Sequence, residues 1–168
     1  MEYWDLYDKD RKPLHRTIMR GEQFGEGEYY VCCEVCIANK DGKFLITRRH
    51  PSKWRGGMWE FTGGGVLAGE TTLQGAMREV AEEIGIYAEE SQFTYLITYT
   101  NKNYFMDVYL LKEDVIIQNL HLQESEVTEA KLADKKEIQQ MVLNGEFVKS
   151  EWERFLMYEN VLTLALQK

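Results

Sequence analysis

The alternation of hydrophobic and polar positions predicts several buried strands interrupted by one well-defined helix. Short apolar runs rich in β-branched and aromatic residues are typical of strands that are buried in a sheet. They occur at 30–38, 43–48, 58–61, 93–99 and 104–111. Between the third and fourth runs, apolar residues recur at helical spacing instead: Leu73, Ala76, Met77, Val80 and Ile84. We therefore expect a helix between the third and fourth strands.

The ends of this helix are marked by capping residues. Thr71, followed three residues later by Gln74, forms a capping box, and Gly85 supplies the left-handed residue that commonly ends a helix. The pattern predicts a helix over 72–84.

The two ends of the chain carry further elements. Residues 3–6 and 17–20 are predicted to be the arms of a hairpin that turns through 8–11, and 21–27 is a glycine-rich linker. Near the other end, Asp134 with Glu137 and Ser150 with Glu153 each match a capping box and predict two helices. This order of elements predicts an α/β fold in which a mixed sheet lies between helices.

Size and charge bound the class of protein. The chain has 168 residues, 44% of them hydrophobic, which suits one domain with a sizeable core. The net charge of −8 disfavours binding to nucleic acid or to a membrane surface, because phosphates would be repelled. We see no segment apolar enough to span a membrane. The acidic, aromatic start is unlike a signal peptide, so we expect a cytoplasmic protein.

Three cysteines, Cys32, Cys33 and Cys36, lie in the first of the apolar runs. A C-x-x-C pattern can bind zinc or form a redox pair. On a strand, however, positions i and i+3 point to opposite faces and cannot share an ion. We expect these thiols to be buried as small hydrophobic groups.

A cluster of carboxylates on the predicted helix indicates a metal site. Glu79, Glu82 and Glu83 are spaced to lie on one helix face, and Arg78 is placed to pair with Glu82 at i+4. Glu70 lies one turn before the helix, and the run Gly63 to Gly65 is expected to be a loop that presents backbone carbonyls. Charged helix faces are often only solvated. Here the hard oxygen ligands suit Mg²⁺ or Mn²⁺ together with a phosphate substrate.

The segment 64–86 resembles the Nudix box, G-x5-E-x7-R-E-U-x-E-E-x-G-U, at every defined position. The matching residues are Gly64, Glu70, Arg78, Glu79, Val80, Glu82, Glu83, Gly85 and Ile86. The resemblance extends more loosely from Val31 to about Leu132. It implies one Nudix hydrolase domain over 1–168, with the hairpin and linker at 1–27 and a three-layer α/β/α sandwich with C-terminal helices at 28–168.

The resemblance also implies a magnesium-dependent pyrophosphohydrolase acting on a nucleoside diphosphate derivative or a similar small organic pyrophosphate. Gly64, Glu79, Glu82 and Glu83 would hold the metal ion, and Arg78 would orient the carboxylates. The general base would be a glutamate of the box or of a downstream loop. In that loop we prefer Glu126 to Glu129, although capping or solvation explains either residue equally well.

Candidate contacts to the substrate lie on both sides of the box. A basic cluster between two predicted strands, Arg48, Arg49, His50, Lys53 and Arg55, is either a solvated loop or a clamp on a polyphosphate. Large aromatics near strands are more often core, but some stack on bases. The candidates for stacking are Trp54, Trp59, Tyr99 and Tyr104.

Two other functions compete with hydrolysis. The N-terminal pattern also resembles Nudix relatives built on the isopentenyl diphosphate isomerase plan. However, the chain has no cysteine at 61–64 and no histidine at 29–30, where that isomerase carries its catalytic groups. A non-catalytic nucleotide sensor would generally have an eroded box, whereas this box is intact. A homodimer through the hairpin and the C-terminal helices stays open, because packing on their own core explains their aromatic residues equally well.

Overall fold

Strands from most of the chain build one mixed seven-stranded sheet in the computed structural model, which describes residues 1–167. The central order is β5 (Trp59–Glu60), β4 (Phe44–Arg49), β3 (Tyr30–Ala38), β8 (Tyr104–Lys112) and β7 (Phe93–Thr100). Off this path, β6 (Thr62–Gly65) pairs with β3, and β9 (Val127–Ala133) pairs with β4. The sheet is mixed because β3 and β8 run parallel while the other pairs are antiparallel.

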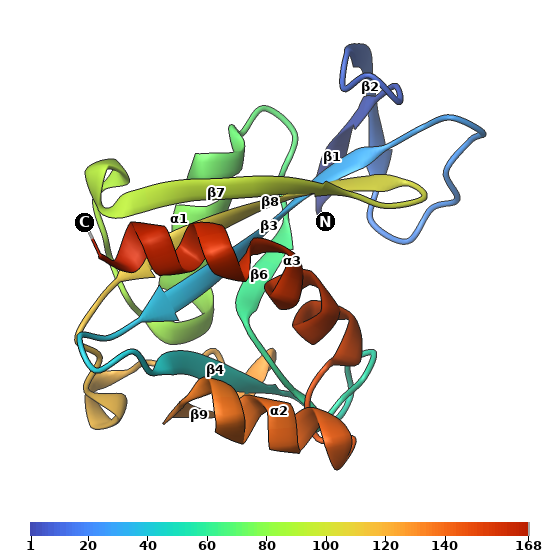
Figure 1. Cartoon of the computed structure of the whole chain (residues 1–168). Helices are drawn as coiled ribbons and strands as arrows, with labels where there is room; N and C mark the ends of the chain where they lie inside the picture. The colour runs from blue at the N-terminus through green and yellow to red at the C-terminus, as the bar shows by residue number, and fades with distance from the viewer. Residues whose placement is uncertain (168) are drawn as a thin grey trace.

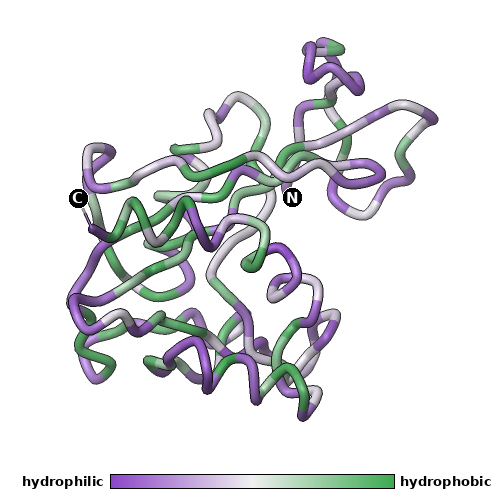
Figure 2. Tube along the Cα trace, in the orientation of Figure 1, coloured by the Kyte–Doolittle hydropathy of each residue, from purple (hydrophilic) through white to green (hydrophobic). Residues whose placement is uncertain are grey.

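Helices cover both faces of this sheet (Figure 1). Helix α1 (Thr72–Ile84) packs on one face, and α2 (Lys135–Leu143) and α3 (Lys149–Leu166) pack on the other. The strand β3 shows why both faces need cover, since its consecutive residues Val35 and Cys36 point to opposite faces and enter two separate hydrophobic clusters. The expected α/β/α sandwich with C-terminal helices is confirmed. Figure 2 shows the hydrophobic positions concentrated in the inner strands and in α3.

The N-terminal hairpin forms a separate two-stranded antiparallel sheet of β1 (Tyr3–Tyr7) and β2 (Pro13–Met19). The prediction of 17–20 for the second arm was too short, because the strand begins at Pro13, directly after the turn at 8–12. The Asp8 side chain accepts from the backbone N–H groups of Asp10 and Lys12, and Arg11 adopts a positive φ of 60°. The strand therefore begins directly after this tight turn.

The glycine run was predicted as a loop, and the structure corrects this. Residues 62–65 form β6, paired antiparallel with β3 in the register Cys33↔Gly64. A Cβ at Gly63 would lie 2.3 Å from the carbonyl oxygen of Cys33. Glycine is therefore required by the close approach of two strands rather than by a flexible loop.

The C-terminal half contains one confirmed cap and two corrections. Helix α2 begins after Asp134 with the predicted capping box to Glu137. Helix α3 begins at Lys149 after Val148, so the predicted Ser150 cap was wrong, and Glu153 lies 3.7 Å from Lys149 instead. The strand β9 (VTEAKLA) was missed because Glu129 and Lys131 interrupt it and it has no aromatic residue, so it lacks the apolar run by which the other strands were predicted. Two short 3-10 helices, η1 (Glu90–Gln92) and η2 (Ile117–Asn119), flank β7 and β8.

Candidate active site

A cavity of about 330 Å³ lies where β3, β6 and α1 meet the N-terminal end of α3 and the hairpin. Its lining is dominated by carboxylates from separate parts of the chain. They are Glu2, Glu34, Glu60, Glu79, Glu82, Glu83, Glu126 and Glu151. The arginines that line it are Arg20, Arg49, Arg78 and Arg154. All three helical glutamates predicted from the box therefore face one cavity.

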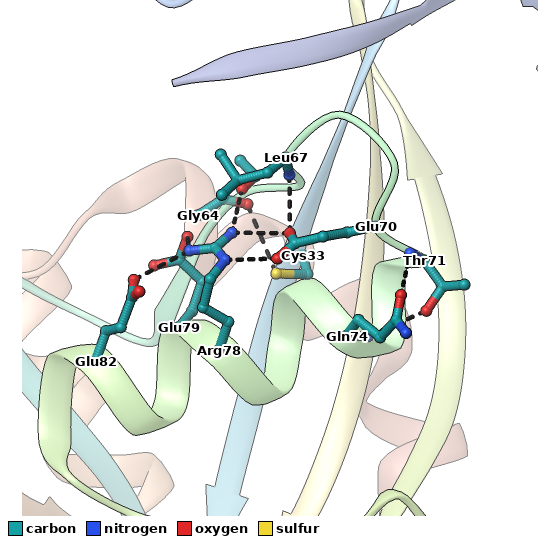
Figure 3. Close-up of polar contacts among 10 residues, drawn as sticks. Cys33, Gly64, Leu67, Glu70, Thr71, Gln74, Arg78, Glu79 and Glu82 are labelled. Atoms are coloured by element: carbon teal, nitrogen blue, oxygen red, sulfur yellow. Dashed lines mark hydrogen bonds and ion pairs between the residues drawn. The ribbon is translucent and has the colours of Figure 1, made fainter. Parts of the chain in front are cut away.

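Arg78 organises the rim of this cavity (Figure 3). Its Nε donates to Glu70 Oε1 at 2.9 Å, and its Nη1 donates to Glu79 Oε1 at 2.8 Å and Glu82 Oε2 at 3.2 Å. Its Nη2 donates to the carbonyl of Gly65 at 2.9 Å. The guanidinium thus links the helix, the preceding loop and β6, and it offsets the repulsion between neighbouring carboxylates.

Gly64 and Glu79 fit closely against one another. A Cβ at Gly64 would lie 2.4 Å from Glu79 Oε1, so only glycine lets this carboxylate rest against β6. Burial, followed by the charge of Glu82, raises the pKa of Glu79, while Arg78 opposes the shift. The box glycine and the box helix therefore fit closely at this point.

Glu83 is the most deeply placed carboxylate of the helix. It is 8% exposed, and its Oε2 is buried with no hydrogen-bond partner among residues 1–167. Burial, and next the charge of Glu79, raises the pKa of Glu83 well above its usual value. An ionised oxygen without a partner is costly in such a place, and a cation would remove that cost.

The atoms that the box residues offer are chemically suited to bind a divalent metal ion. The Gly64 carbonyl and the carboxylates of Glu79, Glu82 and Glu83 are hard oxygen donors, which Mg²⁺ and Mn²⁺ prefer. As the side chains lie, no three acidic, histidine or cysteine side chains in the described part of the chain are arranged to hold a metal. Arg78 bonds only Oε1 of Glu79 and only Oε2 of Glu82, which leaves the second oxygen of each carboxylate without a bond to Arg78.

A second set of buried charges lies under α3. Arg154 Nε donates to Glu34 Oε2 at 3.0 Å, and the Tyr158 hydroxyl donates to Glu34 Oε1 at 3.0 Å. Close by, Glu151 accepts from the backbone N–H of Phe61 at 2.8 Å. Sequence reasoning missed these residues. A signal was present, since Glu34 interrupts an otherwise apolar strand.

The predicted basic cluster is divided by the structure. Arg49 lines the cavity and pairs with Glu60, whose pKa is raised by burial to about 7 against the pull of Arg49. Arg48 lies outside the cavity and pairs with Glu129 at 2.6 Å. Lys53 pairs with Glu126. Arg55 lies over the ring of Trp54, which lines the cavity mouth.

The predicted aromatic contacts are also divided. Trp59 packs against the core on the α3 side with Lys131 over its ring. Tyr104 is not among the residues that line the cavity, and the centroid of its ring lies 5.9 Å from that of Tyr30. The aromatic residues that do line the cavity include Trp4 and Tyr30. Both were missed. Nothing in the sequence indicated that the hairpin strand carrying Trp4 reaches the box, and Tyr30 begins β3, where a large aromatic is usually core. The three cysteines are free and buried as expected.

Comparison with known proteins decides the family. The family model of the NUDIX domain matches residues 31–154. The chain belongs to the Nudix hydrolases. An uncharacterized Nudix hydrolase of Listeria monocytogenes is 36% identical over 151 residues, covering 88% of this chain and 89% of the relative. Members of this family are pyrophosphatases that act on phosphoric anhydride bonds and generally use divalent metal ions.

Solved structures of Nudix proteins share the fold. A Deinococcus radiodurans protein has a TM-score of 0.74 at 21% identity, covering 88% of this chain and 92% of its own. The NUDIX domain of Shewanella oneidensis NrtR, solved with ADP-ribose, has a TM-score of 0.63 at 16% identity, covering 79% and 87%. No helix within residues 1–167 of this Nudix hydrolase is long and apolar enough to cross a membrane.

Proposed function

We propose that this Nudix hydrolase is a Mg²⁺- or Mn²⁺-dependent enzyme that cleaves the diphosphate linkage of a nucleoside diphosphate derivative or a similar small organic pyrophosphate. The observation that carries the proposal is the Arg78 network. It gathers Glu70, Glu79 and Glu82 beside the glycine strand at the rim of a cavity. An acidic rim of this kind binds a diphosphate only with cations between the two sets of negative charge.

Gly64, Glu79, Glu82 and Glu83 would hold the metal ion. When bound, such an ion neutralises a diphosphate, polarises its oxygens and lowers the pKa of a coordinated water. Arg78 would keep these carboxylates in position through one oxygen of Glu79 and one of Glu82, while its contacts with Glu70 and the Gly65 carbonyl fix the guanidinium.

Glu126 is our candidate for the general base. It lines the same cavity as Glu79, Glu82 and Glu83, and Lys53 holds its carboxylate at the rim. Glu129 lies outside this cavity in its surface pair with Arg48. In the proposed reaction Glu126 takes a proton from water, the water oxygen bonds to phosphorus, and a bridging P–O bond breaks. Both products carry phosphate: one phosphorus gains the water oxygen, and the other fragment leaves with the former bridging oxygen as part of its phosphate group.

The substrate class follows from size and charge. A cavity of 330 Å³ lies at the small end of the range for small-molecule sites, and the net charge of −8 disfavours a nucleic-acid or membrane partner. The ADP-ribose bound by the S. oneidensis domain supports a nucleoside diphosphate derivative. We keep the cytoplasm as the proposed compartment.

The direct test is hydrolysis in heavy-oxygen water. Purified protein is incubated with Mg²⁺ and a panel of nucleoside diphosphate derivatives, nucleoside triphosphates, dinucleoside polyphosphates and isopentenyl diphosphate. We expect Mg²⁺-dependent incorporation of the label into one phosphate product, which mass spectrometry identifies. Ligand binding without cleavage of any compound would refute hydrolysis and favour a nucleotide sensor, and isomerised isopentenyl diphosphate would favour the isomerase.

A further inference from the structure

The hairpin is attached to the loop that leads into the box helix. The backbone N–H of Ala68 donates to the Tyr3 carbonyl at 2.8 Å, and that of Gly69 donates to Asp5 Oδ2 at 2.8 Å. Trp4 lies between these two anchors and lines the cavity. The strand β1 therefore holds the indole beside the box from both sides.

Trp4 is fitted against the glycine strand. A Cβ at Gly65 would lie 2.5 Å from Trp4 Nε1, and the Gly65 carbonyl is the one that accepts from Arg78. The Trp4 Nε1 atom is buried and has no hydrogen-bond partner among the described residues. Gly64 thus leaves space for the Glu79 carboxylate and Gly65 leaves space for the Trp4 ring, so two neighbouring glycines bring both groups to one cavity.

Three aromatic rings stand together at this position. Trp4 stacks on Tyr30 with centroids 4.5 Å apart, and Phe24 stacks on Tyr30 at 5.0 Å. The centroids of Trp4 and Phe24 are 6.4 Å apart with only 6° between their planes, so two nearly parallel rings pack on Tyr30. Trp4, Tyr30 and the adjoining Met106 give the cavity an apolar wall. We call Trp4, Tyr30 and Met106 together the hairpin wall.

The hairpin wall is held by a second, distant anchor. Arg11 in the hairpin turn donates to both carboxylate oxygens of Asp107 on β8, at 2.8 and 2.6 Å. Asp107 is only 4% exposed. A bidentate pair at a buried carboxylate is geometrically specific, so the hairpin is fixed to the main sheet rather than loosely tethered.

Among the other aromatic residues that line the cavity, Phe61 is buried and Trp54 has Arg55 over its ring, so the hairpin wall is the favoured place for a planar organic group. Each lining arginine is already paired with a glutamate: Arg20 with Glu2, Arg49 with Glu60, Arg78 with the box, and Arg154 with Glu34. The remaining charged groups are carboxylates, which favour a cation and not an uncharged ring. Aromatic side chains, in contrast, bind a planar base by stacking, worth about 1–3 kcal/mol per base.

We propose that Trp4 is a specificity-determining residue: the hairpin wall receives the planar base of a nucleoside diphosphate substrate while the box holds its diphosphate. This inference rests on the proposed function and names the substrate class of the same site. The hairpin is then part of the active site, and substrates that lack an aromatic group gain nothing from it.

The test compares two ligands that resist hydrolysis and differ only in the nucleoside. These are α,β-methylene-ADP and methylenediphosphonate, titrated calorimetrically in Mg²⁺ buffer. Trp4→Leu keeps an apolar side chain without an aromatic face, and Trp4→Phe keeps a face without the N–H. Tyr3→Ala removes an exposed aromatic from the same strand and serves as the matched control.

We expect Trp4→Leu to weaken α,β-methylene-ADP about tenfold and to leave methylenediphosphonate within twofold, with Trp4→Phe and Tyr3→Ala close to wild type. Equal binding of α,β-methylene-ADP by the Leu and Phe variants would overturn the proposal. Equal weakening of both ligands by Trp4→Leu would also overturn it, because the residue would then only support the fold. If the wild type bound neither ligand, the diphosphate site itself would be refuted, before any variant is compared.

Discussion

Two arginine–glutamate networks line the same cavity and differ in how much of their side chains is exposed to solvent. At the rim, Arg78 is 20% exposed and holds Glu79 and Glu82, whose side chains are 14% and 54% exposed. Under α3, Arg154 and Glu34 are 5% and 3% exposed, and Tyr158 occupies the other carboxylate oxygen. The network at the rim is therefore partly exposed to solvent, whereas the network under α3, made of the same residue types, is sealed from it.

This difference separates a site that can react from one that supports the fold. The rim carboxylates keep solvent-facing lone pairs and can exchange partners, which binding a cation requires. In the sealed network each oxygen of Glu34 already accepts a hydrogen bond. Removing one member there would leave a buried charge, whereas removing a rim carboxylate would leave the others with Arg78.

The largest expected effect is on turnover at the rim. Glu82→Gln removes a proposed metal ligand, and we expect a loss of about 10³-fold in kcat, equivalent to about 4 kcal/mol. Stability should change little, because the side chain is 54% exposed. Steady-state kinetics and thermal unfolding measure both quantities, with the exposed Glu153→Gln as control. Wild-type turnover in Glu82→Gln would show that the metal assignment is wrong.

The sealed network should respond in the opposite way. Arg154→Met leaves the Glu34 charge buried with Tyr158 alone, so we expect a loss of about 3–5 kcal/mol in the free energy of unfolding. Arg20→Met breaks an exposed pair with Glu2 and should cost less than about 1 kcal/mol. Urea denaturation of the two variants measures the contrast. Similar losses in both would mean that burial does not distinguish these pairs.

The same contrast explains what could be predicted from the sequence. The rim network is local: Arg78, Glu79 and Glu82 lie within two turns of one capped helix, so their spacing fixed their common face. Glu34 and Arg154 are 120 positions apart, and only the packing of α3 on β3 brings them together. No periodicity in either segment indicates such a pair.

Two other errors have a physical origin. The run Gly63–Gly65 has low strand propensity, but pairing with β3 leaves no space for side chains and overrides that propensity. Trp4 was placed in the hairpin, and the aromatic residues there were assigned to their own core or to a dimer contact. Its proximity to the box depends on a backbone contact of Tyr3 and on the Asp5 side chain. Contacts made by main-chain atoms leave little trace in the identity of the residue.

A smaller effect would sharpen the choice of general base. Glu126 lines the cavity, and Glu129 pairs with Arg48 outside it. We expect Glu126→Gln to lower kcat about 10²-fold, within the usual range for a general base, and Glu129→Gln to lower it less than twofold. Kinetics of the two variants at saturating Mg²⁺ measure this. If the two variants lost activity equally, the base would have to come from the box.

The smallest effect concerns Glu60, which lies in the cavity and pairs with Arg49. Burial raises its pKa to about 7 in the folded protein, whereas an unfolded glutamate titrates near 4.5. Between these values the folded chain binds a proton that the unfolded chain has released. Without metal, the free energy of unfolding should therefore fall as pH rises from about 5 to 7.

Glu60→Gln should make this decline shallower, because the amide does not titrate. Some slope should persist, since burial also raises the pKa of Glu83 and Glu151. Urea denaturation at pH 5, 6 and 7 in metal-free buffer measures the slope for both proteins. Identical slopes would show that Arg49 keeps Glu60 ionised throughout, and Glu60 would then resemble the sealed Glu34 pair rather than the responsive rim.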